Sequence, residues 1–151
     1  MANPFVALSA ADTSAATDEL PLLKEWAWDF EHDVFLYDDT GRHITVMGNE
    51  ALKVWIYKAL KTERYRYECY RHGIYDASCD YGAELERYIG KHANSKETAA
   101  NISAAVKECL LVNPYIQSVD RVDIAEREKD RLTLTVYLTS VYGELVEEVS
   151  V

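Results

Sequence analysis

Residues 49–90 read NEALKVWIYKALKTERYRYECYRHGIYDASCDYGAELERYIG, and this stretch decides how the rest of the chain is arranged. Its first part predicts an amphipathic helix, because apolar residues recur with a period of about 3.6 residues. Asn49 is expected to cap the start of this helix. The face expected to be buried comprises Leu52, Trp55, Ile56, Ala59 and Leu60. The face expected to point outward carries Lys53, Tyr57, Lys58 and Lys61.

A connector rich in arginine and tyrosine follows, and a short second helix is predicted to open at Tyr81-Gly82 and to close at Gly90. Seven of the 11 tyrosines lie between residues 57 and 88, and residues 50–72 carry six lysines or arginines against three glutamates in a chain of net charge −10. Tyrosine and arginine are enriched at protein interfaces, so the cluster predicts a contact surface. The alternative stays open for any single residue: the tyrosines cap an ordinary core and the arginines pair with nearby acids.

Length and composition narrow the class of protein. A chain of 151 residues and 17.2 kDa is long enough to bury a core as one domain. The net charge of −10 argues against nucleic acid as the main ligand, because phosphate binding needs a basic face. No apolar run approaches the ~20 residues that span a membrane, and the N-terminus lacks a signal-peptide pattern. Cys69, Cys79 and Cys109 are too few for a disulfide framework, so we expect synthesis in a reducing cytoplasm.

The remaining elements predict an α+β fold in a single compact domain, residues 21–151, preceded by a flexible arm, residues 1–20. Aromatic and β-branched clusters before residue 48 predict a small antiparallel meander of strands at 26–30, 34–37 and 43–46. Asn94 or Ser95 is expected to cap a longer helix that runs to about Val112. The stripe that this helix buries comprises Ile102, Ala105, Val106, Cys109 and Leu110.

The last third predicts an antiparallel sheet. Its clearest pattern is the strict alternation of Leu132, Leu134, Val136 and Leu138 with polar residues. Flanking strands are expected at 116–125 and 145–151, with a charged turn at 126–130. A terminal strand at a sheet edge leaves N–H and C=O groups that either are blunted or recruit another strand. Glu147 and Glu148 could do the blunting, or could bias which partner strand is accepted.

Two constellations could suggest chemistry. Glu63 and Asp80 could be the two carboxylates that glycoside cleavage needs, but coincidental pairs are expected among 26 acidic residues. Cys69, His72 and Cys79 could be loose metal ligands, but their spacing matches no compact zinc pattern. The sequence contains no glycine-rich phosphate loop and no His-Glu-x-x-His motif. We therefore predict a protein that is not an enzyme, without catalytic residues, cofactor or metal.

Several segments resemble the XkdS-like baseplate proteins of PBSX-type prophages and contractile-tailed phages. The segments are residues 48–52, 55–56, 58–65, 80–82, 84–85, 105–110 and 113–116. These proteins belong to the wider baseplate-wedge and sheath-initiator superfamily that carries the label "lysozyme-like", and the similarity covers residues 25–151. In that superfamily a Glu-Pro-Arg motif follows the long helix. The matching residues here are Asn113, Pro114 and Tyr115, so the carboxylate and the guanidinium are gone and Tyr115 would offer a ring and a hydroxyl instead.

The resemblance implies a structural component of a contractile tail or tailocin baseplate, present in several copies around the tail axis. Its expected partners are baseplate wedge proteins, tail tube or hub proteins, and the tail sheath protein, whose first ring it would template. The C-terminal sheet is expected to resemble the sheath handshake domain, in which strands of neighbouring subunits complete one sheet. Nucleic acid and membrane are not expected partners.

The residues expected to bind partners fall into three groups. The connector group is Lys58, Lys61, Glu63, Arg64, Tyr65, Arg66, Tyr67 and Tyr81. The proline-turn group is Asn113, Pro114 and Tyr115, and the sheet group is Leu134, Val136, Leu138, Val149 and Val151. Two rival functions remain: a peptidoglycan-degrading, lysozyme-like tail enzyme, and a regulatory or adaptor domain of the same fold.

Overall fold

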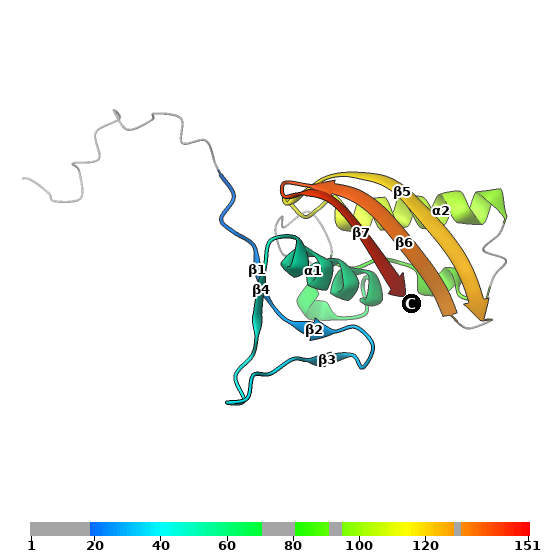
Figure 1. Ribbon diagram of the computed structural model, residues 1–151. Helices are drawn as coiled ribbons and strands as arrows, with labels where there is room; N and C mark the ends of the chain where they lie inside the picture. The colour runs from blue at the N-terminus through cyan, green and yellow to red at the C-terminus, as the bar shows by residue number, and fades with distance from the viewer. Residues whose placement is uncertain (1–18, 71–80, 91–94, 129–130) are drawn as a thin grey trace, which may run out of the picture.

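The computed structural model describes residues 19–70, 81–90, 95–128 and 131–151, and within them the fold is α+β, as predicted (Figure 1). The helices α1 (Asn49–Lys61) and α2 (Lys96–Leu110) lie against one face of a three-stranded antiparallel sheet. Its strands are β5 (Ile116–Glu128), β6 (Arg131–Ser140) and β7 (Gly143–Ser150). The order β5-β6-β7 places β6 in the centre and the C-terminal strand at an edge.

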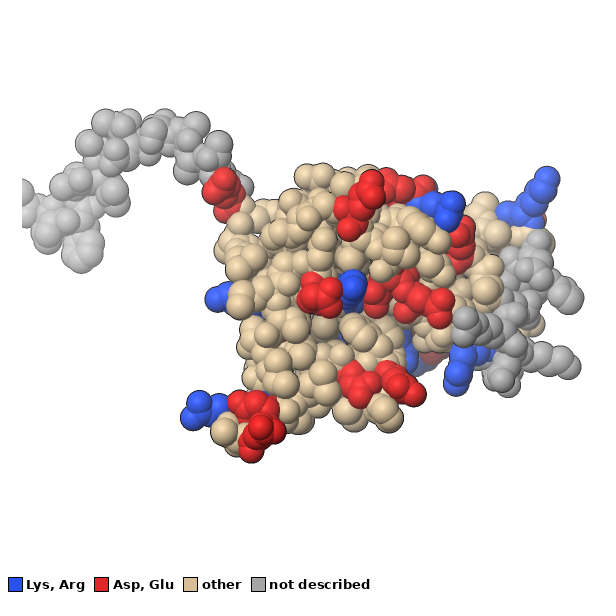
Figure 2. All heavy atoms as spheres, viewed as in Figure 1, with Lys and Arg blue, Asp and Glu red and all other residues tan. Residues whose placement is uncertain are grey.

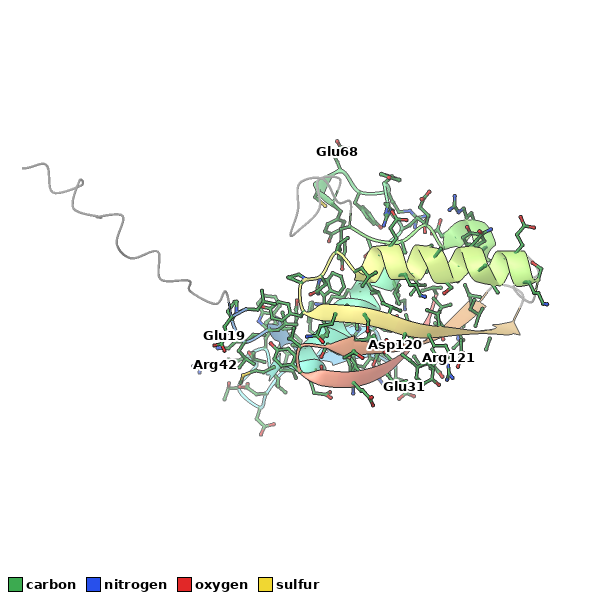
Figure 3. All side chains as sticks on the ribbon, turned by 90° about the horizontal axis from the view of Figure 1, so that it is seen from above. Glu19, Glu31, Arg42, Glu68, Asp120 and Arg121 are labelled. Atoms are coloured by element: carbon green, nitrogen blue, oxygen red, sulfur yellow. The ribbon has the colours of Figure 1, made fainter. Side chains whose placement is uncertain are left out.

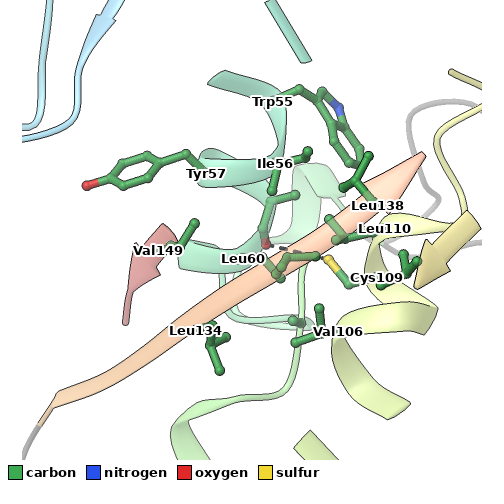
Figure 4. Packing of buried hydrophobic residues seen from close by; sticks show 14 of the residues in the cluster. Trp55, Ile56, Tyr57, Leu60, Val106, Cys109, Leu110, Leu134, Leu138 and Val149 are labelled. Atoms are coloured by element: carbon green, nitrogen blue, oxygen red, sulfur yellow. Dashed lines mark hydrogen bonds between the residues drawn. The ribbon is translucent and has the colours of Figure 1, made fainter. Parts of the chain in front are cut away.

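Helix α1 is the centre of the core. The predicted apolar face is buried against the sheet and α2, as Figure 4 shows for Trp55, Ile56 and Leu60. The prediction that Tyr57 points outward is wrong, because N-terminal strands cover that side of the helix and leave Tyr57 only 6% exposed. The Tyr57 hydroxyl donates a hydrogen bond to Asp33 Oδ1 at 2.6 Å. The helix is therefore packed on two opposite sides.

The start of α1 also differs from the prediction. Gly48, with φ of 62°, is the cap residue, and Asn49 is already helical. The Asn49 side chain accepts a hydrogen bond from Ser140 Oγ at 2.7 Å. Asn49 therefore ties the start of the helix to the end of β6 instead of capping its own backbone.

The N-terminal strands form two short pairs in place of a simple meander. The strands β1 (Lys24–Trp26) and β4 (Thr45–Met47) pair with each other, as do β2 (Trp28–Asp29) and β3 (Val34–Phe35). Between the two pairs, three backbone segments close a ring of hydrogen bonds: Ala27 N donates to Ile44 O, Ile44 N to Leu36 O, and Leu36 N to Ala27 O. The three residues that precede these positions stack their rings on one another, with the Trp26 and His43 centroids 4.4 Å apart and Phe35 edge-on to both.

Helix α2 and the sheet complete the core. Ser95 caps α2 by accepting a hydrogen bond from Thr98 N at 3.1 Å, and the helix ends at Leu110, before Val112. Most of the predicted stripe is buried, although Ala105 is only half-buried. The four alternating apolar residues of β6, from Leu132 to Leu138, are each at most 2% exposed. Burial raises the pKa of the Cys109 thiol to about 12, so this cysteine is an apolar core residue (Figure 4).

Two element boundaries were predicted wrongly. No helix opens at Tyr81-Gly82: Ala83 forms a parallel bridge with Glu63, and a single 3₁₀ turn, η2 (Glu86–Tyr88), follows. Strand β5 continues to Glu128, through residues that were expected to turn. A second 3₁₀ turn, η1 (Glu68–Tyr70), lies in the connector.

Candidate partner-binding surfaces

The outer edge of β7, which pairs with no other strand of the described residues, is the first candidate surface. Leu132 and Val151 exchange both backbone hydrogen bonds, at 2.9 and 2.8 Å. Hydrogen-bonded and non-hydrogen-bonded pairs alternate along an antiparallel ladder. In this register, the backbone groups of every second residue of β7 therefore form hydrogen bonds with β6. The backbone N–H and C=O groups of the residues between them point away from the sheet. These residues are Glu144, Val146, Glu148 and Ser150.

The other edge of the sheet is less regular. The pairing of β5 with β6 shifts register between Ile116 and Ser118, between Val119 and Arg121, and between Glu126 and Glu128. Bulges twist an edge strand and interrupt its row of hydrogen-bonding groups, which hinders the addition of another strand. The register of β7 is continuous from Gly143 to Ser150. Of the two edges, β7 is therefore the better template for a partner strand.

The predicted sheet residues support this edge from inside. Leu134, Val136, Leu138 and Val149 are buried in the core, with exposed fractions of 0–1%, and Val151 is partly buried. A partner at the edge of β7 would meet the backbone and the outward side chains, above all Val146, which is 51% exposed. These four buried residues anchor β6 and β7 in the core.

Several charged connector residues are engaged within the chain. Lys58 Nζ lies 3.4 Å from Glu25 Oε2, and Lys61 Nζ lies 2.9 Å from Asp33 Oδ2. The Arg64 side chain is only 9% exposed. Its Nη1 binds Glu108 Oε1 at 2.6 Å, and its Nε donates to the carbonyl oxygen of Gly82 at 3.1 Å.

Glu63 and Tyr81 also have structural surroundings. Glu63 Oε2 accepts the backbone N–H groups of Leu85 and Glu86, each at 3.2 Å, and so holds the start of η2. Tyr81 is 7% exposed and packs edge-on against Trp55. These two residues fasten the segment 81–90 to the end of α1.

The exposed part of the connector is Tyr65, Arg66 and Tyr67. The two tyrosines are 52% and 51% exposed, and Arg66 forms a surface ion pair with Glu86. Figure 3 shows Glu68, the next residue, beyond α2 on the side of the molecule away from β6 and β7. The connector surface and the β7 edge therefore lie on different sides of the domain.

The proline turn holds the N-terminal segment. Asn113 is fully buried and accepts a hydrogen bond from Tyr115 N at 2.9 Å, while Pro114 is exposed. Tyr115 is 6% exposed, and its hydroxyl donates to the carbonyl oxygen of Pro21 at 2.7 Å. The hydroxyl of Tyr142 accepts a hydrogen bond from Leu23 N at 2.9 Å. The ring and hydroxyl of Tyr115 are thus used within the chain.

An exposed apolar surface on the N-terminal strands was missed by the sequence analysis. Trp26, Tyr37 and Met47 are 51–54% exposed, and Trp26 lies flat on His43. Trp26 and Tyr37 were predicted only to form strands, and Met47 lies just beyond the predicted strand 43–46. The alternation of Trp26, Trp28 and Phe30 places all three rings on one face of a strand, which is typical of a buried face, so the sequence carried no local signal for this exposure.

Catalytic and metal sites gain no support from the described part of the chain. No group of three or more histidine, cysteine or acidic side chains is placed there to hold a metal ion. Asp80, His72 and Cys79, which belonged to the two chemical hypotheses, lie outside the described residues. None of the helices in the described ranges is long and apolar enough to cross a membrane.

Two helices behind a three-stranded sheet, with a regular strand at its edge, define a small, compact α+β domain. The family model described as the contractile injection system sheath initiator matches residues 24–143, from β1 to the first residue of β7. The chain therefore belongs to the sheath-initiator family and is a structural component of a contractile injection system. No curated protein matches the chain. Almost all of β7 follows the matched residues.

Proposed function

We propose that this protein sits in the baseplate of a contractile tail or tailocin and templates the first sheath ring by offering the free edge of β7 to a sheath strand. The observation that carries the proposal is the continuous register of β7, which leaves four residues with outward backbone groups. Main-chain hydrogen bonds would give a directional joint, and alternating side chains would fix its register.

Docking to the rest of the baseplate would use the opposite side of the domain. Tyr65, Arg66 and Tyr67 combine two half-exposed rings with a guanidinium, a composition typical of interface hot spots. Because this surface lies away from β7, wedge or tube proteins and the sheath could bind the same copy at once (Figure 3). As in the XkdS-like baseplate proteins, several copies around the tail axis would present several such edges, after synthesis in the host cytoplasm.

Replacing Val146 by proline tests the strand joint. The Val146 N–H points away from β6, so proline removes a group that the isolated chain does not use for its ladder. We expect Val146→Pro to keep the wild-type circular dichroism spectrum but to bind the co-expressed sheath protein at least about tenfold more weakly. Val146→Thr is the matched control, because it changes the side chain and keeps the N–H.

The two variants separate the effect of losing the Val146 N–H group from the effect of changing its side chain. Weak binding by the proline variant alone supports strand addition. Equal binding by the folded proline variant and the wild type would show that the sheath does not pair with this edge.

For the connector surface, Tyr65→Ala and Tyr67→Ala should each abolish co-purification with baseplate partners while sheath binding is retained.

A further inference from the structure

Glu147 is the one acidic residue on the core-facing side of β7, a strand that the structure describes completely. The residue is only 9% exposed. Leu145 and Val149 flank it along the strand, and Val136 faces it across the ladder. A carboxyl group in such surroundings has lost most of its hydration, and this burial raises the pKa of Glu147 to about 7.

Helix α1 brings two charged groups near Glu147 without neutralising it. Lys53 lowers the pKa of Glu147 and Glu50 raises it, but burial is the larger influence. Lys53 Nζ is bound to Glu50 Oε1 at 3.0 Å. Among the residues that the structure describes, none forms a hydrogen bond or an ion pair with the Glu147 carboxylate. The strand therefore carries an uncompensated acid on its inner side.

A group that pairs with the Glu147 carboxylate could be supplied by a strand bound at the outer edge of β7. On one side of Glu147 the neighbour is Val136 of β6, and on the other side the sheet ends. A strand added to β7 would set one of its own core-facing side chains beside Glu147 and would remove the remaining contact with water. Burying an unpaired carboxylate is strongly unfavourable, whereas a buried and well-paired one is tolerated.

We infer that the strand that pairs with β7 carries a lysine or arginine on its core-facing side, at the position beside Glu147. The inference rests on the proposed function, because it requires that a strand is added at this edge. Charge complementarity supports it: β7 also carries Glu144 and Glu148, and the chain has a net charge of −10. Acidic side chains predominate on this face of the molecule (Figure 2).

A cationic partner and a protonated glutamic acid predict opposite effects of pH on binding. With a cation beside it, Glu147 is ionised in the complex, so binding expels its proton and tightens as the pH rises from 6 to 8. If the acid were instead buried in its neutral form, binding would take up a proton and would weaken over the same range. Glu50 and Lys53 of α1 are the charged groups that face Glu147, and β6 contributes only Val136.

The test measures binding of the full-length chain to the sheath protein encoded with the same tail, by biolayer interferometry at pH 6 and pH 8. Glu147→Gln should weaken binding at pH 8 by about tenfold or more, because the cation of the partner is then buried unpaired. Glu148→Gln removes the same charge from the outer face and should change affinity by about threefold at most. The wild type should bind more tightly at pH 8 than at pH 6, and Glu147→Gln should lose this dependence. Circular dichroism checks that each variant is folded.

The outcomes for the two proposals can be told apart. If the wild type binds the sheath protein and Glu147→Gln binds as tightly or more tightly at pH 8, the inference is overturned and strand addition stands. If the wild type itself does not bind, or if Val146→Pro binds normally, the proposed function falls and the inference falls with it. A tenfold loss of affinity for the sheath protein that is confined to Glu147→Gln supports both the proposed function and the inference.

Discussion

Replacing Gly82 by alanine should destabilise the fold far more than an ordinary surface substitution. Gly82 has φ of 98°, and a Cβ atom there would lie 2.5 Å from the carbonyl oxygen of Thr62. That oxygen accepts a hydrogen bond from Ala83 N at 3.0 Å, and Ala83 O accepts one from Arg64 N at 3.2 Å. The added methyl group must therefore push apart the bridge that fastens residues 81–85 to the end of α1.

The magnitude follows from two contributions. A left-handed backbone costs a residue with a Cβ atom about 1–2 kcal/mol. Displacement of the two bridging hydrogen bonds costs about 1 kcal/mol each, so we expect a loss of about 3–4 kcal/mol in the free energy of unfolding. Gly143→Ala is the matched control, because Gly143 has φ of 112° and nothing lies within 4 Å of its Cβ position. The control should lose only the backbone part, about 1–2 kcal/mol.

Urea unfolding followed by circular dichroism at the helical minimum measures both variants. A folded domain of this size is stable by about 5–15 kcal/mol, so each variant should fold and show a lower midpoint with an unchanged slope. The difference between Gly82→Ala and Gly143→Ala isolates the close approach to Thr62. If the two variants lose the same free energy, the reasoning from the 2.5 Å contact is refuted.

Two further predictions concern a buried acid and two tyrosine hydroxyls. The pKa of Glu147 lies at about 7 in the folded chain, above its ordinary 4.5, so the folded state holds the proton more tightly. The contribution of this group to the free energy of unfolding is then full below about pH 4.5 and falls by about 2–3 kcal/mol as the pH rises through 7. Urea midpoints at pH 5 and pH 8 should show this decline in the wild type. If the same decline persisted in Glu147→Gln, its assignment to Glu147 would be contradicted. Tyr142→Phe leaves Leu23 N without its acceptor and should speed hydrogen exchange of that amide by about fivefold. Tyr115→Phe is the control, because it removes only the hydrogen bond to Pro21 O. Equal exchange at Leu23 in the wild type and in Tyr142→Phe would show that the Tyr142 hydroxyl does not hold this segment.

The parts of the fold that were predictable are those that a local period determines. The stripe from Leu52 to Leu60 and the alternation from Leu132 to Leu138 are both buried, because a single element and one buried face produce each pattern. The environment of Tyr57 was not predictable in this way. It depends on Asp33, which is 24 positions away in the sequence, and no local pattern encodes that contact.

The candidate surfaces were also predictable only as far as local sequence determines them. Composition marked the connector as rich in arginine and tyrosine, but it did not separate Arg64, which binds Glu108 from 44 positions away, from the exposed Arg66. The order β5-β6-β7 is what places β7 at an edge. Which of its backbone groups face outward required the register, and the burial of Glu147 required the helix packed behind it.

The ladder between β6 and β7 also sets how the molecule bears force. Its hydrogen bonds run across the strands, so a pull along β7 strains all pairs from Ser140–Gly143 to Leu132–Val151 together. A pull away from the sheet instead opens them one after another, beginning at Val151. A terminal strand held on a single side is thus mechanically anisotropic: it resists shear and yields to peeling.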